Sequence, residues 1–134
     1  MRSRFLSSES LSPDYGLLLL RLMAGACVFT HGWQKIQNIM AGNFQFGDPV
    51  GLGPEVSLYL SAFAEGLCSI LIILGLVTRL ATIPLIINFA VAFFIAHQAD
   101  EFNIKELPLI YLTIFLTLFF TGPGKLSLDR RIFG

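Results

Sequence analysis

The chain has 134 residues, which is enough for one domain. Hydrophobic residues make up 54% of it and charged residues only 13%, whereas about a quarter of the residues in a soluble domain are charged, so a water-facing surface is not expected. The formal net charge is zero, which excludes the excess of basic residues that a nucleic-acid-binding surface needs. The apolar residues are gathered into long blocks, and this pattern indicates a membrane protein.

Four apolar blocks come close to the roughly 20 residues that a helix needs to cross a bilayer core of about 30 Å. We therefore predict an all-α fold, a four-transmembrane-helix bundle that forms a single membrane domain over residues 1–134. The predicted helices cover approximately residues 14–36, 55–77, 80–97 and 105–121, and an outer loop covers residues 37–54. The fourth block is short, so we expect it to gain a turn from the residues before it or to lie where the bilayer is thin.

Basic residues are distributed unevenly between the two sides of this predicted bundle. Four spans place both termini on the same side. This side collects Arg2, Arg4, Arg79, Lys125, Arg130 and Arg131, whereas the opposite side has Lys35 and Lys105. Cytoplasmic segments of membrane proteins carry the excess of Lys and Arg, so we expect both termini to be cytoplasmic.

The long outer loop is rich in glycine and also holds Phe44 and Phe46. Its glycines follow no predicted strand and precede no Gly-Lys-Ser/Thr sequence, so they do not form a phosphate-binding loop. The loop is either a flexible surface segment or a lid that dips into the membrane interface through its two Phe residues. The sequence leaves both interpretations open.

The most informative residue is Glu65, which interrupts the apolar segment 56–77. A carboxylate at this depth is costly unless it is paired, protonated or directed into a polar cavity, so it is a candidate functional residue. If the depth is counted at 1.5 Å per residue from the side of the termini, Arg21 lies at about 10 Å, Glu65 at about 21 Å and His31 at about 26 Å. Lys35 lies higher still. The sequence leaves open which of these three cations pairs with Glu65.

This group of charges has two interpretations. In the functional one, Glu65 and His31 are catalytic residues that exchange protons or hydrogen-bond a ligand in a polar pocket, and Lys35 supplies positive charge. In the structural one, a buried ion network fixes only the packing of the helices. One stripe of the first helix also carries two glycines, Gly25 and Gly32, which predict a close approach of another helix.

No cofactor motif stands out in the sequence. His31 and His97 could in principle ligate one haem iron, but they are the only two histidines and Lys35 crowds one of them, so we do not expect haem. Cys27 and Cys68 form no Cys-x-x-Cys pair, and we interpret them as small buried hydrophobic residues, with a transient disulfide as the alternative. The chain holds no metal-binding, flavin, iron–sulfur or nucleotide motif.

The polar landmarks follow one another in an order that resembles a known family. They are Arg21 and His31-Gly32-Trp33-Gln34-Lys35 in the first helix, Glu65-Gly66 and Leu74-Gly75-Leu76-Val77-Thr78-Arg79 in the second, His97 at the end of the third, and Gly122-Pro123-Gly124-Lys125-Leu126-Ser127-Leu128-Asp129 after the fourth. This ordered set resembles the DoxX family of small four-helix membrane proteins. Our candidate ligand-binding residues, Lys35, Arg21, Trp33 and His97, all come from these motifs.

The resemblance implies a multi-pass protein of the bacterial or archaeal inner (cytoplasmic) membrane that is linked to redox metabolism. The family takes its name from a subunit of a thiosulfate:quinone oxidoreductase. We therefore expect a quinone-reactive or oxidoreductase-associated subunit, linked to sulfur or oxidative-stress metabolism, with quinone as its cofactor and a redox enzyme as its partner. The alternatives are a carrier or channel for a small solute or proton, which would need a homo-oligomer, and a non-catalytic scaffold for a partner redox enzyme.

Overall fold

The computed structural model describes residues 5–134, and within these residues every regular element is a helix. The elements are α1 (Pro13–Met40), α2 (Pro54–Ala62), the π-helix η1 (Phe63–Cys68), α3 (Ser69–Leu74), α4 (Thr78–Val91), the π-helix η2 (Ala92–Ala96), α5 (Phe102–Thr121) and α6 (Leu128–Phe133). Arg2 and Arg4, on which the prediction of orientation partly depends, lie outside the described residues.

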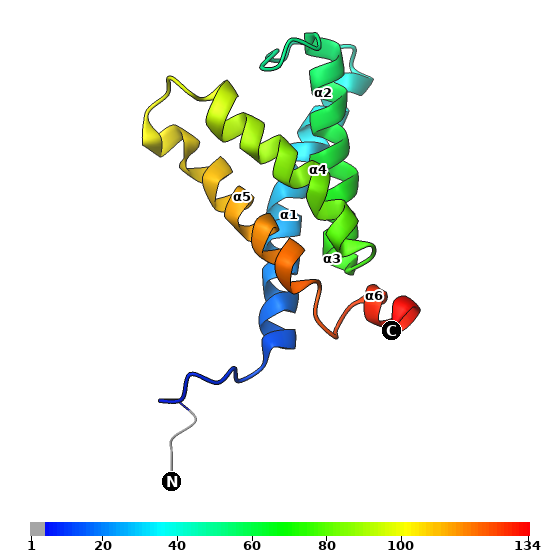
Figure 1. Ribbon diagram of the computed structural model, residues 1–134. Coiled ribbons are helices and arrows are strands. Elements are labelled where there is room, and N and C mark those ends of the chain that lie inside the picture. Colours follow the sequence, from blue (N-terminus) through cyan, green and yellow to red (C-terminus); the bar gives the residue numbers. More distant parts are fainter. Residues whose placement is uncertain (1–4) are drawn as a thin grey trace.

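Four segments of the described chain are long and apolar enough to cross a membrane, which confirms the predicted all-α fold with four spans. These segments are Pro13–Met40, Pro54–Leu74, Thr78–Ala96 and Phe102–Thr121. The second span joins α2, η1 and α3, and the third joins α4 and η2. The N-terminal segment and the C-terminus lie at the same end of the bundle, which we call the terminal end (Figure 1). The opposite end, the loop end, carries the loops 41–53 and 97–101.

Local chemistry explains where two of the helices begin and end. The Ser12 hydroxyl caps α1 by accepting a hydrogen bond from Tyr15 N at 3.4 Å. α1 then continues to Met40, beyond the predicted residue 36, because the next glycine or proline in the sequence is Gly42. α5 begins at Phe102, so the fourth span includes the extra turn that its short apolar block lacked.

The two glycines of α1 lie at its closest contacts with the second span. A Cβ atom on Gly25 would lie 2.5 Å from Ile73 Cγ1, and a Cβ atom on Gly32 would overlap the backbone of Glu65 and Gly66. The predicted close approach of another helix is therefore confirmed. At Gly32 this close approach brings α1 into contact with η1, the segment that carries Glu65.

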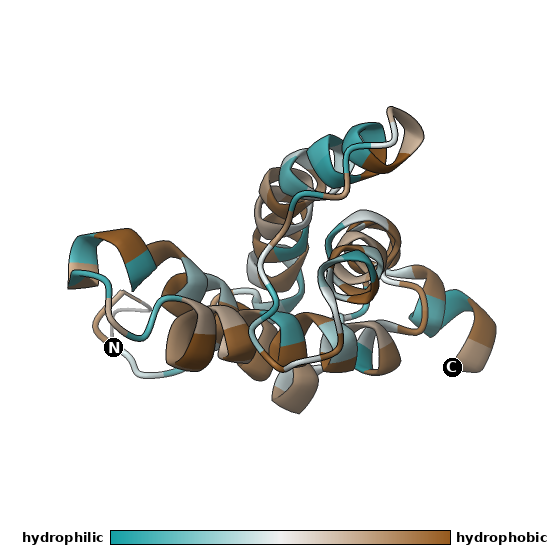
Figure 2. Cartoon of the chain, turned by 90° about the horizontal axis from the view of Figure 1, so that it is seen from above, coloured by the Kyte–Doolittle hydropathy of each residue, from teal (hydrophilic) through white to brown (hydrophobic). Residues whose placement is uncertain are grey.

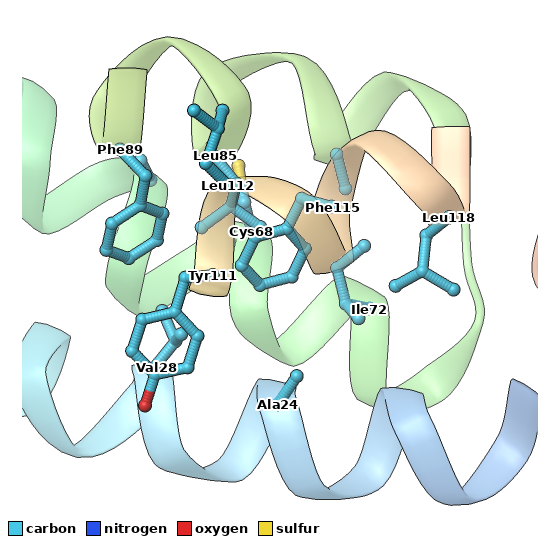
Figure 3. Packing of buried hydrophobic residues seen from close by; sticks show 12 residues of the cluster. Ala24, Val28, Cys68, Ile72, Leu85, Phe89, Tyr111, Leu112, Phe115 and Leu118 are labelled. Atoms are coloured by element: carbon cyan, nitrogen blue, oxygen red, sulfur yellow. The ribbon is translucent and has the colours of Figure 1, made fainter. Parts of the chain in front are cut away.

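The apolar core lies between α1, the second span, α4 and α5 (Figure 3). The ring of Phe89 lies 5.1 Å from that of Tyr111 and 6.0 Å from that of Phe115, measured between centroids, and these aromatic contacts join α4 to α5. Large apolar side chains such as Leu19 and Ile87 are also exposed on the outer surface of the bundle. Figure 2 shows hydrophobic residues along all of the long helices. Such a surface suits lipid, and the chain is a membrane protein.

At the terminal end, Arg21 of α1 is almost completely buried, with 1% of its surface exposed. Its guanidinium donates hydrogen bonds to four main-chain carbonyl oxygens, namely Ile72 O (3.0 Å), Ile73 O (3.2 Å), Pro123 O (2.7 Å) and Leu126 O (3.0 Å). Two of these carbonyls lie near the C-terminal end of α3, where partners within the helix run out. Arg21 thus ties α1, α3 and the chain beyond α5 together.

A second set of contacts holds the turn between α3 and α4. Val77 has a φ angle of 44°, which is strained for a β-branched residue. The Asp129 carboxylate accepts hydrogen bonds from Val77 N at 2.6 Å and Thr78 N at 2.9 Å, and Asp129 N donates to Gly75 O at 2.8 Å. Asp129 lies in the first turn of the short helix α6, which the sequence did not predict. This helix therefore positions the carboxylate that binds the turn.

Candidate functional site

Glu65 lies in the π-helix η1, where the second span makes its close contact with Gly32 of α1. π-Helical turns are rare and occur frequently at functional sites. The Ser69 hydroxyl donates to the backbone oxygens of Glu65 at 2.5 Å and Gly66 at 2.9 Å, and so satisfies carbonyls of this widened turn. Only 5% of the Glu65 surface is exposed, so the carboxylate is withdrawn from solvent.

Three side chains from three different helices donate to the Glu65 carboxylate. Lys35 Nζ of α1 lies 2.7 Å from Glu65 Oε1. The Ser61 hydroxyl of α2 donates to Oε2 at 2.7 Å, and Asn88 Nδ2 of α4 donates to the same oxygen at 2.9 Å. We call these four residues the Glu65 network. They join the first three spans of the bundle.

The direction of side chains on helices explains why Lys35, and not a nearer cation, pairs with Glu65. Cα–Cβ bonds tilt toward the N-terminus of their helix. α1 and the second span run in opposite directions, so Lys35 reaches back toward the terminal end while Glu65 reaches toward the loop end and Ser61. The two side chains meet between their backbone heights. The pairing that the sequence left open is therefore the one with Lys35.

The partners of Glu65 suit an ionised carboxylate. An ionised carboxylate is only an acceptor, and three donors occupy most of its lone-pair sites. The charge of Lys35 compensates that of Glu65, so the pair is neutral as a whole, and this lowers the cost of placing it within a membrane span. Ser61 stands four residues before Glu65, and this spacing could have identified it. Asn88 is the one side-chain amide in the third span.

The Glu65 network borders a cavity of about 890 Å³ at the loop end, between α1, the second span, α4 with η2, and α5. Its polar lining side chains are His31, Lys35, Ser57, Ser61, Glu65, Asn88, His97 and Tyr111. The other lining residues are apolar side chains, glycine and proline, which include Phe63 of η1 and Phe89 of α4. The cavity is therefore an apolar space with polar groups concentrated at the Glu65 network and along the loop end.

The loop 41–53 forms part of the cavity wall. Phe46, Pro49, Val50 and Leu52 line the cavity, and Lys35 Nζ lies 5.9 Å from the centroid of the Phe46 ring. The other aromatic residue of this loop, Phe44, packs against Tyr59 of α2 instead. The loop is thus in contact with both the charged site and the second span, as a lid would be.

Both histidines lie on the cavity wall, but neither is hydrogen-bonded to the carboxylate of Glu65. The ring of His31 meets the edge of Tyr111, with centroids 6.5 Å apart. Figure 3 shows the Tyr111 hydroxyl pointing toward α1. His97 Nδ1 lies 2.7 Å from Asp100 Oδ2 in the loop that follows η2. The structure therefore brings His31, His97, Lys35 and Glu65 to one cavity.

Two other candidate ligand-binding residues lie away from the cavity wall. Arg21 is at the terminal end and donates to backbone carbonyls, a placement that favours a structural role. Trp33 is half-exposed on α1 and stacks on Phe29, with ring centroids 6.3 Å apart. The two cysteines are both free: Cys27 is exposed and Cys68 is buried in the core. Only Cys68 therefore has the environment of a buried hydrophobic residue.

Comparison with known proteins identifies the family. Residues 16–98 match the family model described as DoxX. An uncharacterized protein of Haemophilus influenzae is 33% identical over 130 residues, which cover 89% of this chain and 92% of the relative. A Bacillus subtilis protein named "Putative oxidoreductase CatD" is 31% identical, covering 91% of this chain and 90% of its own.

An uncharacterized membrane protein of Mycobacterium tuberculosis, Rv3486, is 28% identical and covers 87% of this chain and 80% of its own length. No solved structure matches the chain significantly. The family model covers more than half of the chain, including the helices that carry Lys35, Glu65 and Asn88. The chain therefore belongs to the DoxX family of membrane proteins.

Proposed function

We propose that the cavity at the loop end binds the head group of a lipid-soluble quinone, and that the protein is a quinone-reactive subunit associated with a redox enzyme. The observation that carries this proposal is the apolar cavity of about 890 Å³ beside the Glu65 network. Ligand sites are typically cavities of about 300–1,000 Å³ with apolar and aromatic walls and a few convergent polar groups. A quinone head group complements such a cavity, because its flat apolar ring suits the apolar walls and its two oxygens accept hydrogen bonds from the polar groups.

Lys35 is the donor best placed for a quinone oxygen. Its ammonium group has three N–H donors, of which one is used for Glu65. The Lys35 side chain is 19% exposed and that of Glu65 6%, so Lys35 is the more accessible member of the pair. Phe63 and Phe89 supply aromatic wall surface for the ring of the ligand.

Reduction of a quinone to a quinol takes up two electrons and two protons. In this proposal the electrons come from a partner dehydrogenase, and the protons pass through the charged groups of the cavity wall. Lys35 can donate a proton to the quinone oxygen, and Glu65, 2.7 Å away, stabilises the ammonium form of Lys35. His31, one helical turn before Lys35 on α1, is a further carrier of protons on the same wall. The name of the Bacillus subtilis relative supports a link to redox chemistry.

Several lining residues support entry of the ligand from the bilayer. Leu60 and Phe63 of the second span and Ile83 and Ile87 of α4 line the cavity and are also exposed on the outer surface of the bundle. All four lie within the membrane spans. A ligand dissolved in lipid can therefore approach between these two spans without crossing water.

The proposal is tested by quinone binding to the purified protein in lipid nanodiscs. Decylubiquinone is titrated while the fluorescence of Trp33, the single tryptophan, reports binding by its quenching. Lys35→Met should weaken binding about tenfold, because a hydrogen bond from a charged group contributes roughly 1.5–3 kcal/mol. Glu65→Gln should weaken it as well, because Lys35 then lacks its counter-ion.

Lys105→Met is the matched control for this experiment. Lys105 Nζ lies 5.2 Å from the centroid of the Phe93 ring at the loop end, and neither residue lines the cavity. The control variant should bind decylubiquinone as the wild type does. Saturable quenching that is the same in all four proteins would contradict the proposed site. Folded protein that binds no quinone would instead favour a non-catalytic scaffold for a partner enzyme.

We also propose that the protein lies in the inner membrane with both termini in the cytoplasm. Among the described residues, the terminal end gathers Arg79, Lys125, Arg130 and Arg131, whereas the loop end has Lys35 and Lys105. This distribution supports the predicted orientation. A C-terminal fusion to alkaline phosphatase, which is active only outside the cytoplasm, should be inactive. Activity comparable to that of a fusion in the loop 41–53 would reverse the assignment.

A further inference from the structure

Two buried hydroxyl groups have no hydrogen-bonding partner within the described part of the chain, and they lie at opposite ends of the bundle. They are Ser57 Oγ in α2 and Thr78 Oγ1 at the start of α4. Buried polar groups are normally hydrogen-bonded, and leaving one without a partner destabilises the folded state. Each of these groups therefore needs an explanation.

Ser57 differs from Thr78 in its surroundings. Ser57 is 7% exposed and lines the loop-end cavity, whereas Thr78 is fully buried in the turn held by Asp129 and lines no part of that cavity. Ser57 also belongs to a stripe of polar residues on the second span. Ser61 follows it by four residues and Glu65 by eight, so Ser57 stands about 12 Å above Glu65 along the helix axis at 1.5 Å per residue.

We propose that the Ser57 hydroxyl is a second ligand contact, which binds the end of the ligand opposite to that held by Lys35. This inference rests on the proposed function and narrows the class of ligand. A ligand that reaches both groups carries a hydrogen-bonding group at each end of an apolar body, as a para-quinone does. Ser57 and Lys35 thereby select such a molecule against a lipid with one polar end.

Several features of the site fit this role. The cavity wall between Ser57 and the Glu65 network includes Leu60 and Phe63, which present apolar surface to a ring. The hydroxyls of Ser61 and Ser69 are already used, for the Glu65 carboxylate and for backbone carbonyls. Ser57 is thus the one serine of the second span whose hydroxyl is not engaged within the described residues.

Ser57→Ala is the direct test, with Thr78→Val as its matched control. Each change removes a buried hydroxyl that has no partner, so neither should lower the melting temperature of the ligand-free protein, and both should raise it slightly. Ser57→Ala should weaken binding of an alkylated para-naphthoquinone about fivefold to tenfold, which corresponds to a lost hydrogen bond of roughly 1 kcal/mol. Thr78→Val should leave the dissociation constant unchanged.

A second ligand separates loss of a hydrogen bond from a general disturbance of the cavity. A tetralone with the same alkyl tail keeps only one of the two carbonyl oxygens. Wild type and Ser57→Ala should bind this tetralone equally well. The effect of the substitution is therefore expected only with the quinone, as in a double-mutant cycle.

The outcomes distinguish this inference from the proposed function. An equal dissociation constant for the quinone in wild type and Ser57→Ala would overturn the role of Ser57, while the loss of binding in Lys35→Met would still support the quinone site. Equal losses with both ligands, or a lowered melting temperature of Ser57→Ala, would show that Ser57 is structural. If the wild type binds neither ligand, the proposed function fails and this inference fails with it.

Discussion

The two ends of the bundle each contain a buried charged residue, but the hydrogen-bonding partners of the two residues differ. At the terminal end, Arg21 donates to four backbone carbonyls, two in α3 and two in the segment between α5 and α6. At the loop end, the carboxylate of Glu65 contacts three side chains from three helices, beside a cavity. Side chains can turn toward a ligand by changing rotamer, whereas a backbone carbonyl can turn only if the chain itself changes conformation. Burial of a charge therefore does not by itself identify a functional site.

The partners of the charge give the better criterion. Arg21 was a candidate ligand-binding residue in the sequence because it belongs to the motifs of the family and, like Glu65, carries a charge within an apolar block. Its hydrogen bonds to Ile72 O and Pro123 O assign it to the joint between α1, α3 and the C-terminal segment. The comparison predicts that removal of charge damages stability at the terminal end and ligand binding at the loop end.

Arg21→Met should have the largest effect on stability. The substitution removes the donor that four main-chain carbonyl oxygens share, so we expect a loss of about 3–5 kcal/mol in the free energy of unfolding. The measurement is a titration with SDS in mild detergent micelles. Arg79→Met is the control, because Arg79 is exposed and makes a single hydrogen bond to Phe119 O. The control should cost about 0.5 kcal/mol or less.

The same variant can contradict the assignment of Arg21 to a structural role. A variant Arg21→Met that unfolds like the wild type, but no longer binds quinone, would place Arg21 in the functional site despite its distance from the cavity. Arg21→Lys sharpens the result, because lysine keeps the charge but lacks the planar guanidinium that serves several carbonyls at once. We expect Arg21→Lys to be more stable than Arg21→Met but less stable than the wild type.

The sequence predicted those features that depend on local pattern and on depth. The lengths of the apolar blocks determined the four spans, and the two glycines of α1 predicted its close contact with the second span. The depth of Glu65 pointed to the residue that the structure places, buried and ion-paired, beside the loop-end cavity. Depth alone could not choose between Arg21 and Lys35, because each lies about 10 Å of helix rise from Glu65, on opposite sides of it. The tilt of side chains toward the N-terminus of their helix directs Lys35 toward Glu65 and Arg21 away from it.

The sequence could not predict the features that depend on contacts between distant parts of the chain. Asn88 is a single amide in an apolar span, and only the packing of α4 against η1 makes it a donor to Glu65. Asp129 follows the last span and accepts a hydrogen bond from the backbone N–H of Val77, which lies 52 residues earlier in the sequence. The π-helical turn at Glu65 has no sequence signature of the kind that caps or prolines provide.

Breaking the ion pair at the loop end should destabilise the protein less than Arg21→Met does. Lys35→Met leaves the Glu65 carboxylate with two donors, Ser61 and Asn88, and should lower the free energy of unfolding by about 1–2 kcal/mol. The double variant Lys35→Met/Glu65→Gln removes the uncompensated charge and should regain most of this loss. Its stability is measured in the same SDS titration.

The double variant separates stability from function at this end of the bundle. It should fold nearly as well as the wild type and yet bind decylubiquinone about tenfold more weakly, since Lys35 is the proposed donor to the ligand. No second substitution is expected to restore the stability of Arg21→Met, because the partners of Arg21 are backbone atoms that remain in every variant. If the double variant regains quinone binding together with stability, the ion pair is structural. The two ends of the bundle would then differ only in their partners, and the cavity would need another donor.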